Sequence, residues 1–264
     1  MKRPLDELTK VARQAVSIGN DLIKSTRPQK ISEKSDRDTY TDVDVRIEHE
    51  VRSFLKKKTP EIGFLGEEEG ANTDNVNNKY VWILDPIDGT ANFVHGIPLC
   101  ATQIALVHHN KAVVAAVSLP HMDMHYWAAH GTGAFLNGNR INVSETKKLS
   151  KAIVSIGDYA TGIDAKIKNR RRISLTASLA EQVERVRMFG SAAHDLVWLA
   201  DGRTDAAIIL SNNPWDTLAG VLIARESGAK VFDTTNSSHS SSSQNTIAST
   251  KGIADELLDL ISRS

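Results

Sequence analysis

The sequence has almost no cysteine, no net charge and no long apolar run. Cys100 is the only cysteine among 264 residues, which excludes an intrachain disulfide framework and an all-cysteine zinc site. It also favours a reducing compartment, so we expect a cytoplasmic protein. Lysine and arginine together number 32, as do aspartate and glutamate. The chain therefore lacks a global basic field that would attract nucleic acid or an anionic membrane.

No stretch approaches the roughly 18 uncharged apolar residues that a membrane span needs. Residues 1–10 also lack the apolar core of a signal peptide. We therefore expect neither a membrane nor a nucleic acid as partner. Hydrophobic residues make up 41% of the chain and charged residues 24%, which is typical of a folded globular protein. The length accommodates one large domain or two tightly joined ones.

Apolar residues at helical spacing predict two amphipathic helices near the N-terminus, over residues 5–22 and 43–55. Between them, Lys30 to Tyr40 is polar and without periodicity, which predicts a loop that leads into Thr41 as a helix cap. Short apolar runs follow, and two of them end in carboxylates at Glu67 and Asp85. Residues 102–119 read as a hairpin. The first half is therefore predicted to be mixed and partly antiparallel.

After about residue 150 the predicted strands and helices alternate. We expect a strand over 152–157, a helix through Leu175 and Leu179, a strand over 183–189 and a helix over 191–200. A strand over 205–210 and a helix over 216–227 follow. Such alternation indicates layered α/β packing. The serine-rich segment 236–245 is predicted to be a surface loop without assigned chemistry.

Carboxylates gather after two of the predicted strands. Glu67, Glu68 and Glu69 follow one strand, and Asp85 and Asp88 follow the next. If these strand ends are neighbours, each like-charged pair at about 4 Å costs on the order of 4 kcal/mol. Bound cations or protonation must offset that cost. Because no cysteine or histidine accompanies the acids, hard divalent cations such as magnesium, manganese or calcium are favoured over zinc.

The segment DPIDGT at residues 85–90 has a spacing that suits such a site. Pro86 restricts the backbone, so Asp85, the Ile87 carbonyl and Asp88 can point to one side of a tight turn. Gly89 allows close backbone approach. Thr90 is predicted to begin a helix whose free N–H groups could receive a phosphate.

Each of these signals also has an ordinary structural explanation. Asp85 and Asp88 occur in Asp-Pro and Asp-Gly pairs that are typical of turns, and the glutamate run is typical of a solvated loop. Asp216 could simply cap the helix that follows it. Asp44 lies three residues after Thr41, which is the spacing of a capping box. Taken one at a time, the motifs leave both interpretations open.

Taken together, the motifs resemble the inositol monophosphatase family over nearly the whole chain. The matching segments are GEEEG at 66–70, DPIDGTANFVHGIP at 85–98, GAFLNG at 133–138, GSAA at 190–193 and PWDTLAG at 214–220. The resemblance implies an α/β protein with mixed sheets, a layered αβαβα sandwich that is usually a homodimer. An N-terminal half, 1–150, would carry most metal ligands, and a C-terminal half, 151–264, would complete the metal site and the substrate pocket.

The resemblance implies two to three Mg²⁺ ions per site, with Mn²⁺ as an alternative. A first ion would be held by Glu67, Asp85 and the Ile87 carbonyl. A second would be held by Asp85, Asp88 and Asp216, with Asp85 bridging. Two such ions offset the four negative charges of these carboxylates. The implied reaction is hydrolysis of a phosphomonoester by a metal-activated water.

Further roles follow from the same resemblance. Thr90 would orient the attacking water, with its hydroxyl held by Asp44, while Glu67 assists as a base. Lys34 and Asp38 fall in a segment that such enzymes use as a mobile, metal-contacting loop. Lys34 stands four residues before Asp38 here, one fewer than in animal inositol enzymes. The implied substrate contacts are Asp88, Gly89, Thr90, Arg187, Gly190, Ser191, Ala192 and Asp216.

The resemblance also implies that the substrate is a small phosphorylated metabolite. Inositol 1-phosphate ranks first, because the DPIDGTANFVHG block and the chain length are closest to that branch. The alternatives are histidinol phosphate, fructose 1,6-bisphosphate and phosphoadenosine phosphate. Ile209 occupies the position, seven residues before Asp216, where animal inositol enzymes have a glutamate that binds ring hydroxyls. The resemblance also implies lithium sensitivity. A protein-interaction or regulatory module remains as the non-enzymatic alternative.

Two other features have competing interpretations. His121, Asp123 and His125 alternate, which would suit a transition-metal site on a strand, although a solvated face or subunit contact explains them as well. Cys100 is expected to be a small buried apolar residue rather than a nucleophile.

Overall fold

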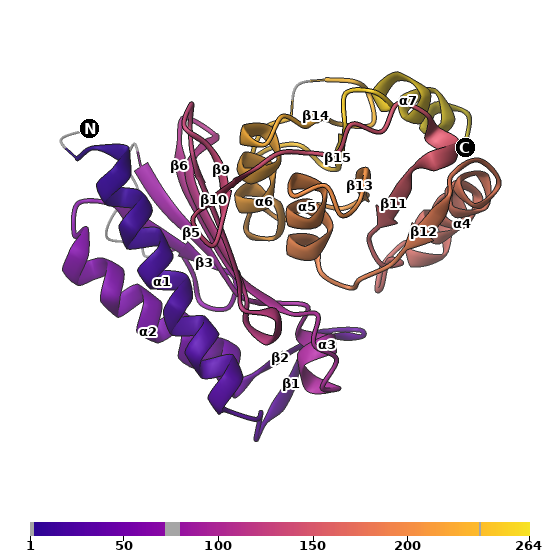
Figure 1. Ribbon diagram of the computed structural model, residues 1–264. Coiled ribbons are helices and arrows are strands. Elements are labelled where there is room, and N and C mark those ends of the chain that lie inside the picture. The colour runs from indigo at the N-terminus through magenta and orange to yellow at the C-terminus, as the bar shows by residue number, and fades with distance from the viewer. Residues whose placement is uncertain (1–2, 72–79, 238) are drawn as a thin grey trace.

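The computed structural model describes residues 3–71, 80–237 and 239–264. Five layers follow one another across the molecule, in the order helices, sheet, helices, sheet, helices (Figure 1). This arrangement confirms the expected layered α/β fold. No helix in these ranges is long and apolar enough to cross a membrane.

The first layer consists of α1 (Leu5–Ser25) and α2 (Asp42–Lys58), which lie against one face of the first sheet (Figure 1). Both helices are amphipathic, as the spacing of their apolar residues predicts. In α1 the buried positions include Leu8, Ala12 and Ala15. In α2 they include Val43, Ile47 and Val51. One apolar stripe on each helix therefore faces the core shared with the sheet.

The first sheet has eight strands in the order β10-β9-β8-β7-β6-β5-β3-β4. All neighbours pair antiparallel except β3 and β5, which are parallel. The strands are β3 (Gly63–Gly66), β4 (Gly70–Ala71), β5 (Tyr80–Asp88), β6 (Ala101–His108), β7 (Lys111–Leu119), β8 (Met124–Ala129), β9 (Gly133–Leu136) and β10 (Asn139–Ile141).

The middle layer consists of α5 (Ala192–Ala200) and α6 (Pro214–Glu226), which are buried on nearly every side. Leu218 and Leu222 pack in the core of the first sheet. Leu196 and Val221 pack with strands of the second sheet. A helix that is apolar all round is the expected solution for a layer with a sheet on each face.

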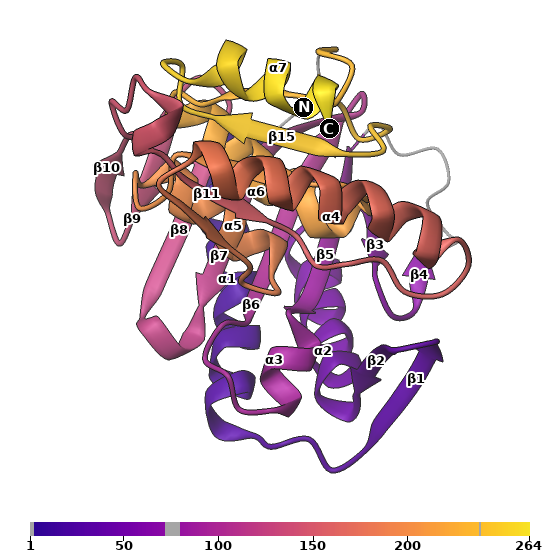
Figure 2. The same ribbon diagram turned by 90° about the vertical axis from the view of Figure 1, so that its right-hand side faces the viewer.

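The second sheet has five strands in the order β12-β11-β13-β15-β14. They are β11 (Ile153–Ile156), β12 (Arg185–Arg187), β13 (Ala206–Ile209), β14 (Lys230–Phe232) and β15 (Thr246–Ser249). The outer helices α4 (Ala165–Gln182) and α7 (Ala254–Arg263) cover its far face (Figure 2). Strands of the first sheet come from residues before 150 and strands of the second from residues after it, while the division into two halves remains a prediction.

The predicted loop from Lys30 to Tyr40 is wrong, because these residues form a hairpin. Its strands are β1 (Ile31–Ser35) and β2 (Asp38–Thr41), paired antiparallel from Ile31 opposite Thr41 onward. Arg37 closes the turn with a positive φ of 58°. Most of these side chains are exposed, so the hairpin lacks the alternating apolar residues by which a half-buried strand is recognised.

Other boundaries differ more modestly from the predictions. The strand expected over 183–189 is limited to Arg185–Arg187. The helix that begins at Thr90 is a single short one, α3 (Thr90–Val94), and Gly89 precedes it with a φ of 83°. The described part of the serine-rich segment is a loop, whereas Ser238 lies outside the described residues. Short 3₁₀ helices occupy Pro120–Met122 and Leu149–Lys151.

Close packing of α1 on β6 supports the segment that follows β5. Gly19 of α1 faces Thr102, whose hydroxyl donates a hydrogen bond of 2.8 Å to the Pro86 carbonyl. A Cβ atom at Gly19 would lie 2.2 Å from Thr102 Oγ1 and within 2.8 Å of two further atoms of that side chain. The whole side chain would have to move, and the hydrogen bond to Pro86 would be lost with it.

We predict that Gly19→Ala lowers the free energy of unfolding. Overpacking of about 1–3 kcal/mol and the lost hydrogen bond of about 1 kcal/mol exceed the gain of about 1 kcal/mol in helix propensity. Chemical denaturation measures the change, with Ser17→Ala on the exposed side of α1 as control. A variant at least as stable as the parent would contradict this packing.

Candidate metal centre

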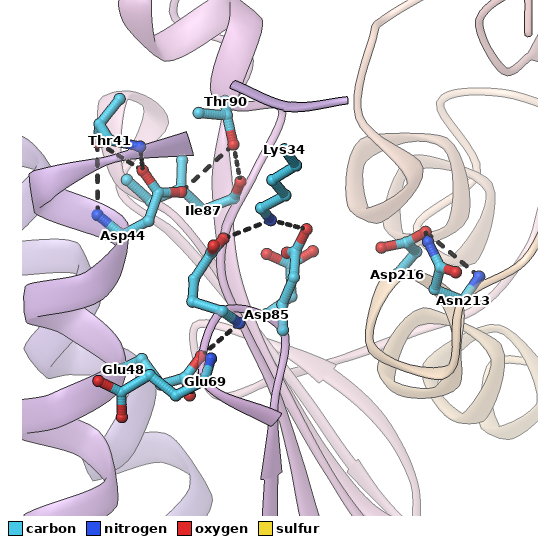
Figure 3. Close-up of polar contacts among 12 residues, drawn as sticks. Lys34, Thr41, Asp44, Glu48, Glu69, Asp85, Ile87, Thr90, Asn213 and Asp216 are labelled. Carbon is cyan, nitrogen blue, oxygen red and sulfur yellow. Dashed lines mark hydrogen bonds and ion pairs between the residues drawn. The ribbon is translucent and has the colours of Figure 1, made fainter. Parts of the chain in front are cut away.

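The carboxylates after two neighbouring strands meet at one end of the first sheet. Gly66 is opposite Leu84 in the parallel pairing of β3 and β5, so Glu67, which follows β3, lies beside Asp85. Asp85 and Asp88 are still part of β5 and do not follow it as predicted, because β5 continues to Asp88 across an irregularity in its pairing with β6. Asp216 approaches from the first turn of α6 (Figure 3). Glu67, Asp85 and Asp216 each offer an oxygen within 4.8 Å of the other two. The structure thus brings together acids that are more than a hundred residues apart in the sequence.

Asp216 both caps a helix and faces this cluster. It forms a capping box with Asn213, whose side-chain amide donates to Asp216 Oδ2 at 3.0 Å. Gln103 on β6 donates to the Asp216 carbonyl at 2.9 Å and reaches Asp85 Oδ2 at 3.5 Å. The capping interpretation is therefore correct but incomplete, because the cap also holds Asp216 toward the first sheet.

Asp88 lies against the N-terminus of α5. Its carboxylate accepts hydrogen bonds from Ser191 Oγ at 2.5 Å, from Ala193 N at 2.6 Å and from Ala192 N at 3.2 Å. These donors stabilise a negative charge at the positive end of the helix. Asp88 lines the same cavity as the other acids, although its oxygens are not part of the tightest group. The GSAA motif at 190–193 therefore holds Asp88 in place.

Lys34 is a cation beside the cluster. Its Nζ donates to Glu67 Oε1 and to Glu68 Oε1, each at 2.7 Å (Figure 3). Burial disfavours the ammonium, but the two glutamates outweigh burial and raise the pKa of Lys34 above its ordinary value. The hairpin β1–β2 thus supplies one positive charge that partly offsets Glu67.

Glu48, which the sequence analysis did not single out, holds the loop that carries Glu67. It is fully buried on α2, where it accepts hydrogen bonds from the backbone N–H of Glu68 at 2.8 Å and of Glu69 at 3.1 Å. Arg52 donates to the same carboxylate at 2.6 Å. A signal for it was present, because Glu48 lies on the helix face of Val43, Ile47 and Val51, where a charge needs a partner.

The Thr90 hydroxyl contacts Asp44, as the resemblance implies, and also contacts the Ile87 carbonyl. It lies 2.9 Å from the Ile87 carbonyl and 3.3 Å from Asp44 Oδ1. Asp44 also completes a capping box with Thr41, whose backbone N–H donates to Asp44 Oδ2 at 2.8 Å. The side chain of Asp44 is thus fixed by the start of α2 and aimed at Thr90. The role of Thr90 in orienting water stays a prediction.

Burial raises the pKa of every acid in this region whose shift is resolved. The pKa rises to about 6 for Asp44 and for Asp88, to about 7 for Glu68 and to about 8 for Asp216. That of Asp85 rises well above its ordinary value. Repulsion from neighbouring carboxylates adds to the effect of burial in each case. The site therefore requires protons or a cation to be stable.

The donor set suits a hard divalent cation. Asp85 Oδ1 is buried and has no hydrogen-bond partner within the described residues, and an unpaired buried acceptor of this kind is costly. The groups around it are carboxylate oxygens and a backbone carbonyl, the ligands that magnesium, manganese and calcium prefer. A divalent ion among Glu67, Asp85 and Asp216 would satisfy the free oxygen and neutralise the repulsion.

A cavity of about 370 Å³ opens above this cluster. Eleven of the residues expected in the site line it: Asp38, Glu67, Asp85, Ile87, Asp88, Gly89, Thr90, Gly190, Ser191, Ala192 and Asp216. Lys34 and Asp44 contact lining residues from outside. Arg187 is exposed, donates to the Val186 carbonyl and is not part of the lining, so its role as a substrate contact has no support from the geometry.

The cavity also contains a charged residue that the sequence analysis missed. Arg172 on α4 is 5% exposed and lines the wall together with Ile209 and Ser211. Its position three residues before Leu175 and seven before Leu179 places it on the buried face of α4. The signal was hidden because Arg172 ends the run Arg170-Arg171-Arg172, which reads as a solvated helix surface.

The transition-metal site that the alternation of His121, Asp123 and His125 suggested is not formed. His121 lies in a 3₁₀ helix rather than on a strand, and Asp123 has a positive φ of 52° and pairs with Lys24. The His125 ring contacts Ser118 at 3.0 Å. These contacts favour a solvated face or a subunit contact over a metal site. Cys100 is fully buried, and burial raises its pKa to about 12, which fits a small apolar residue and not a nucleophile.

Comparison with known proteins agrees with this geometry. The inositol monophosphatase family profile matches residues 4–263. The inositol-1-monophosphatase of Caulobacter vibrioides is 35% identical over 235 residues, covering 88% of this chain and 90% of that protein. The fructose-1,6-bisphosphatase/inositol-1-monophosphatase of Aquifex aeolicus is 33% identical over 232 residues, covering 85% and 84%. The inositol monophosphatase structure from Anabaena (Nostoc) sp. PCC 7120 has a TM-score of 0.88 at 27% identity, covering 98% and 96%.

We predict that the metal-free chain loses stability as the pH rises from 5 to 8. The pKa values of Asp88, Asp216 and Asp85 are raised in the folded chain, so the folded state binds more protons than the unfolded state in this window. Each additional bound proton changes the free energy of unfolding by about 1.4 kcal/mol per pH unit. We therefore expect the Tm to fall by at least about 4 °C between pH 5 and pH 8.

Thermal unfolding in chelator measures this fall. Saturating magnesium should reduce it, because the ion binds the deprotonated cluster and stabilises the folded state more at high pH. Asp85→Asn should have a shallower pH dependence in chelator than the parent. A Tm that does not vary with pH and does not respond to magnesium would contradict the electrostatic description of the cluster.

Proposed function

Since the chain belongs to the inositol monophosphatase family and is thus a phosphoric monoester hydrolase, we propose that it is magnesium-dependent and that inositol 1-phosphate is its substrate. The observation that carries the proposal is the convergence of Glu67, Asp85 and Asp216 at one cavity, where Asp85 Oδ1 has no hydrogen-bond partner among the residues that the structure describes. A site that only stabilised the fold would have no need to gather repelling, partly buried carboxylates at an accessible cavity.

The residues present divide into two ligand groups. Glu67, Asp85 and the Ile87 carbonyl would hold one Mg²⁺ ion, and Asp85, Asp88 and Asp216 a second. A third, weaker ion or Mn²⁺ is compatible with the same donors. When bound, these ions supply the Lewis acidity that makes a water nucleophilic at neutral pH and stabilises the leaving oxygen. Asp88 is held for this task by three donors of α5.

The chain itself positions the attacking water. Thr90 Oγ1 lies beside the Ile87 carbonyl and Asp44, so its oxygen can accept a hydrogen bond from the water while its own proton is donated away. Glu67 lies at the same end of the sheet and can receive the proton that the water loses. Asp44 acts through Thr90 and is therefore a positioning residue. Attack on phosphorus then yields inorganic phosphate and the free alcohol.

The alcohol of the substrate would face the wall formed by Ile209, Gly190 and Ala192. Ile209 lies at the end of β13 and is the position where the resemblance expects a polar contact to ring hydroxyls. Ser211 lines the cavity two residues later and can offer a hydroxyl in its place. Inositol 1-phosphate would then bind at this wall without the hydrogen bond from a charged side chain that the resemblance leads us to expect at position 209.

Three further properties belong to the proposal. We expect a cytoplasmic enzyme, which the single buried cysteine supports. We expect a homodimer, which would cover exposed apolar side chains such as Ile163 and Ile167, 88% and 68% exposed. The expectation of lithium sensitivity rests only on the resemblance to the family. Turnover unaffected by tens-of-millimolar lithium would assign the chain to an insensitive branch.

Phosphate release from a substrate panel tests the reaction. The panel is inositol 1-phosphate, histidinol phosphate, fructose 1,6-bisphosphate and phosphoadenosine phosphate, each with magnesium and with chelator. We expect turnover of inositol 1-phosphate that is lost on chelation and restored by magnesium. Turnover that persists in chelator would refute metal dependence, and a larger kcat/KM for another member would refute the choice of substrate.

We predict that Asp85→Asn lowers kcat for the best substrate at least about a hundredfold, because one oxygen of an ionised ligand is lost from both proposed ion sites. Phosphate release at saturating magnesium measures the change. Glu69→Gln is the matched control, because Glu69 is an exposed acid of the same segment and is not part of the cluster. Near-normal turnover of Asp85→Asn would contradict the assignment.

A further inference from the structure

Arg172 places a positive charge in the wall of the active-site cavity. It projects from the buried face of α4 and is only 5% exposed. Its guanidinium donates to the Asp158 carbonyl and, at 3.2 Å, to Ser211 Oγ. All three residues line the cavity that contains the carboxylate cluster. The contacts fix the guanidinium in place, but both acceptors are uncharged groups.

No carboxylate forms an ion pair with Arg172 in the described part of the chain. The side chain of Asp158 attracts it from beyond ion-pair distance, and Asp158 is exposed, so water screens that attraction. Burial lowers the pKa of Arg172, but an arginine remains protonated at neutral pH. A buried guanidinium without a counter-ion is costly unless a ligand supplies one.

The remaining acid near this wall does not cancel the charge. Asp195 on α5 is buried and lines the cavity, and burial raises its pKa to about 8. Asp195 forms no ion pair with Arg172 within the described residues, and Asp158 is the acid that acts on the pKa of Arg172. Ser211 adds a favourable feature, because its hydroxyl oxygen accepts from Arg172 and its proton is left to donate. The wall thus presents a fixed cation with a hydroxyl donor beside it.

The place of Arg172 decides which part of a substrate it would meet. The phosphoryl group belongs at the cluster formed by β3, β5 and α6. Arg172 and Ser211 come from α4 and from the segment after β13, on the same wall as Ile209. This wall faces the alcohol part of the substrate and not the ester that is cleaved.

We propose that Arg172, with Ser211, forms an anion subsite for the alcohol part of the substrate. The enzyme would then favour a phosphomonoester whose alcohol carries a second negative group, a phosphate or a carboxylate, over the matched ester that lacks this group. The proposal rests on the proposed function and refines it, since inositol 1-phosphate would remain a substrate but would leave the subsite without an anion.

Matched substrate pairs test this preference on the intact magnesium-loaded enzyme. Glycerol 2-phosphate and 2-phosphoglycerate differ by a carboxylate, and fructose 1-phosphate and fructose 1,6-bisphosphate differ by a phosphate. We expect kcat/KM to be at least about tenfold higher for the anionic member of at least one pair, the effect of a charge-assisted hydrogen bond. The pair that responds identifies the anion. Equal values within both pairs would overturn the proposal.

Variants at Arg172 assign the preference to this residue. Arg172→Gln should lower kcat/KM for the preferred anionic substrate at least about tenfold, mainly through KM, and change it less than about threefold for the neutral partner. Arg171→Gln, an exposed neighbour on α4, makes the same charge change outside the cavity and should behave as the parent. An equal loss on both substrates would show a structural role and would overturn the proposal.

Arg172→Lys keeps the positive charge and is the variant to test if Arg172→Gln does not fold. It should retain a preference for the anionic member, and loss of the preference in a folded Arg172→Lys enzyme with unchanged neutral turnover would refute recognition by charge. Failure of the proposed function has a different signature, because the parent would then hydrolyse none of these esters in a magnesium-dependent way.

Discussion

Repulsion among clustered, partly buried carboxylates is the constraint on which the rest of the site depends. Glu67, Asp85 and Asp216 each offer an oxygen within 4.8 Å of the other two, and burial together with mutual repulsion raises the pKa of Asp85 and Asp216. Their neighbours compensate for this repulsion. Lys34 pairs with Glu67, and the N-terminus of α5 donates to Asp88. In the described part of the chain these contacts leave Asp85 Oδ1 without a hydrogen-bond partner, and a divalent cation is the group that would complete the balance of charge.

The five layers explain how such a cluster can be built at all. The parallel pair β3 and β5 brings two acidic segments to one edge of a sheet, which a hairpin of consecutive strands would not do. The middle helices α5 and α6 present their N-termini to that edge, and Gln103 joins the Asp216 backbone to the sheet. Because α5 and α6 also pack on the second sheet, the wall that contains Arg172 and Ile209 is held in register with the carboxylates. The reaction site and the pocket for the alcohol are thus set by one packing arrangement.

Much of this could be predicted from the sequence, for identifiable reasons. Strong apolar periodicity located α1 and α2, and short motifs with several turn and acidic residues located Glu67, Asp85 and Asp216. The hairpin β1–β2 was missed because its strands are exposed and polar on both faces. Glu48 and Arg172 were missed because charged residues on apolar helix faces are rare, and their partners lie far away in the sequence. Arg187 was expected to contact the substrate, but its side chain is exposed outside the cavity lining.

The central claim is that both halves of the chain ligate one cation site, and direct metal binding tests it most simply. Manganese binding to the metal-free protein, followed by electron paramagnetic resonance, compares the parent with Asp216→Asn. The account predicts that the substitution weakens manganese binding by at least about a hundredfold, since even groups that only support a ligand contribute about ten- to a hundredfold. Unchanged affinity and stoichiometry in a folded Asp216→Asn protein would contradict a site shared between the first sheet and α6.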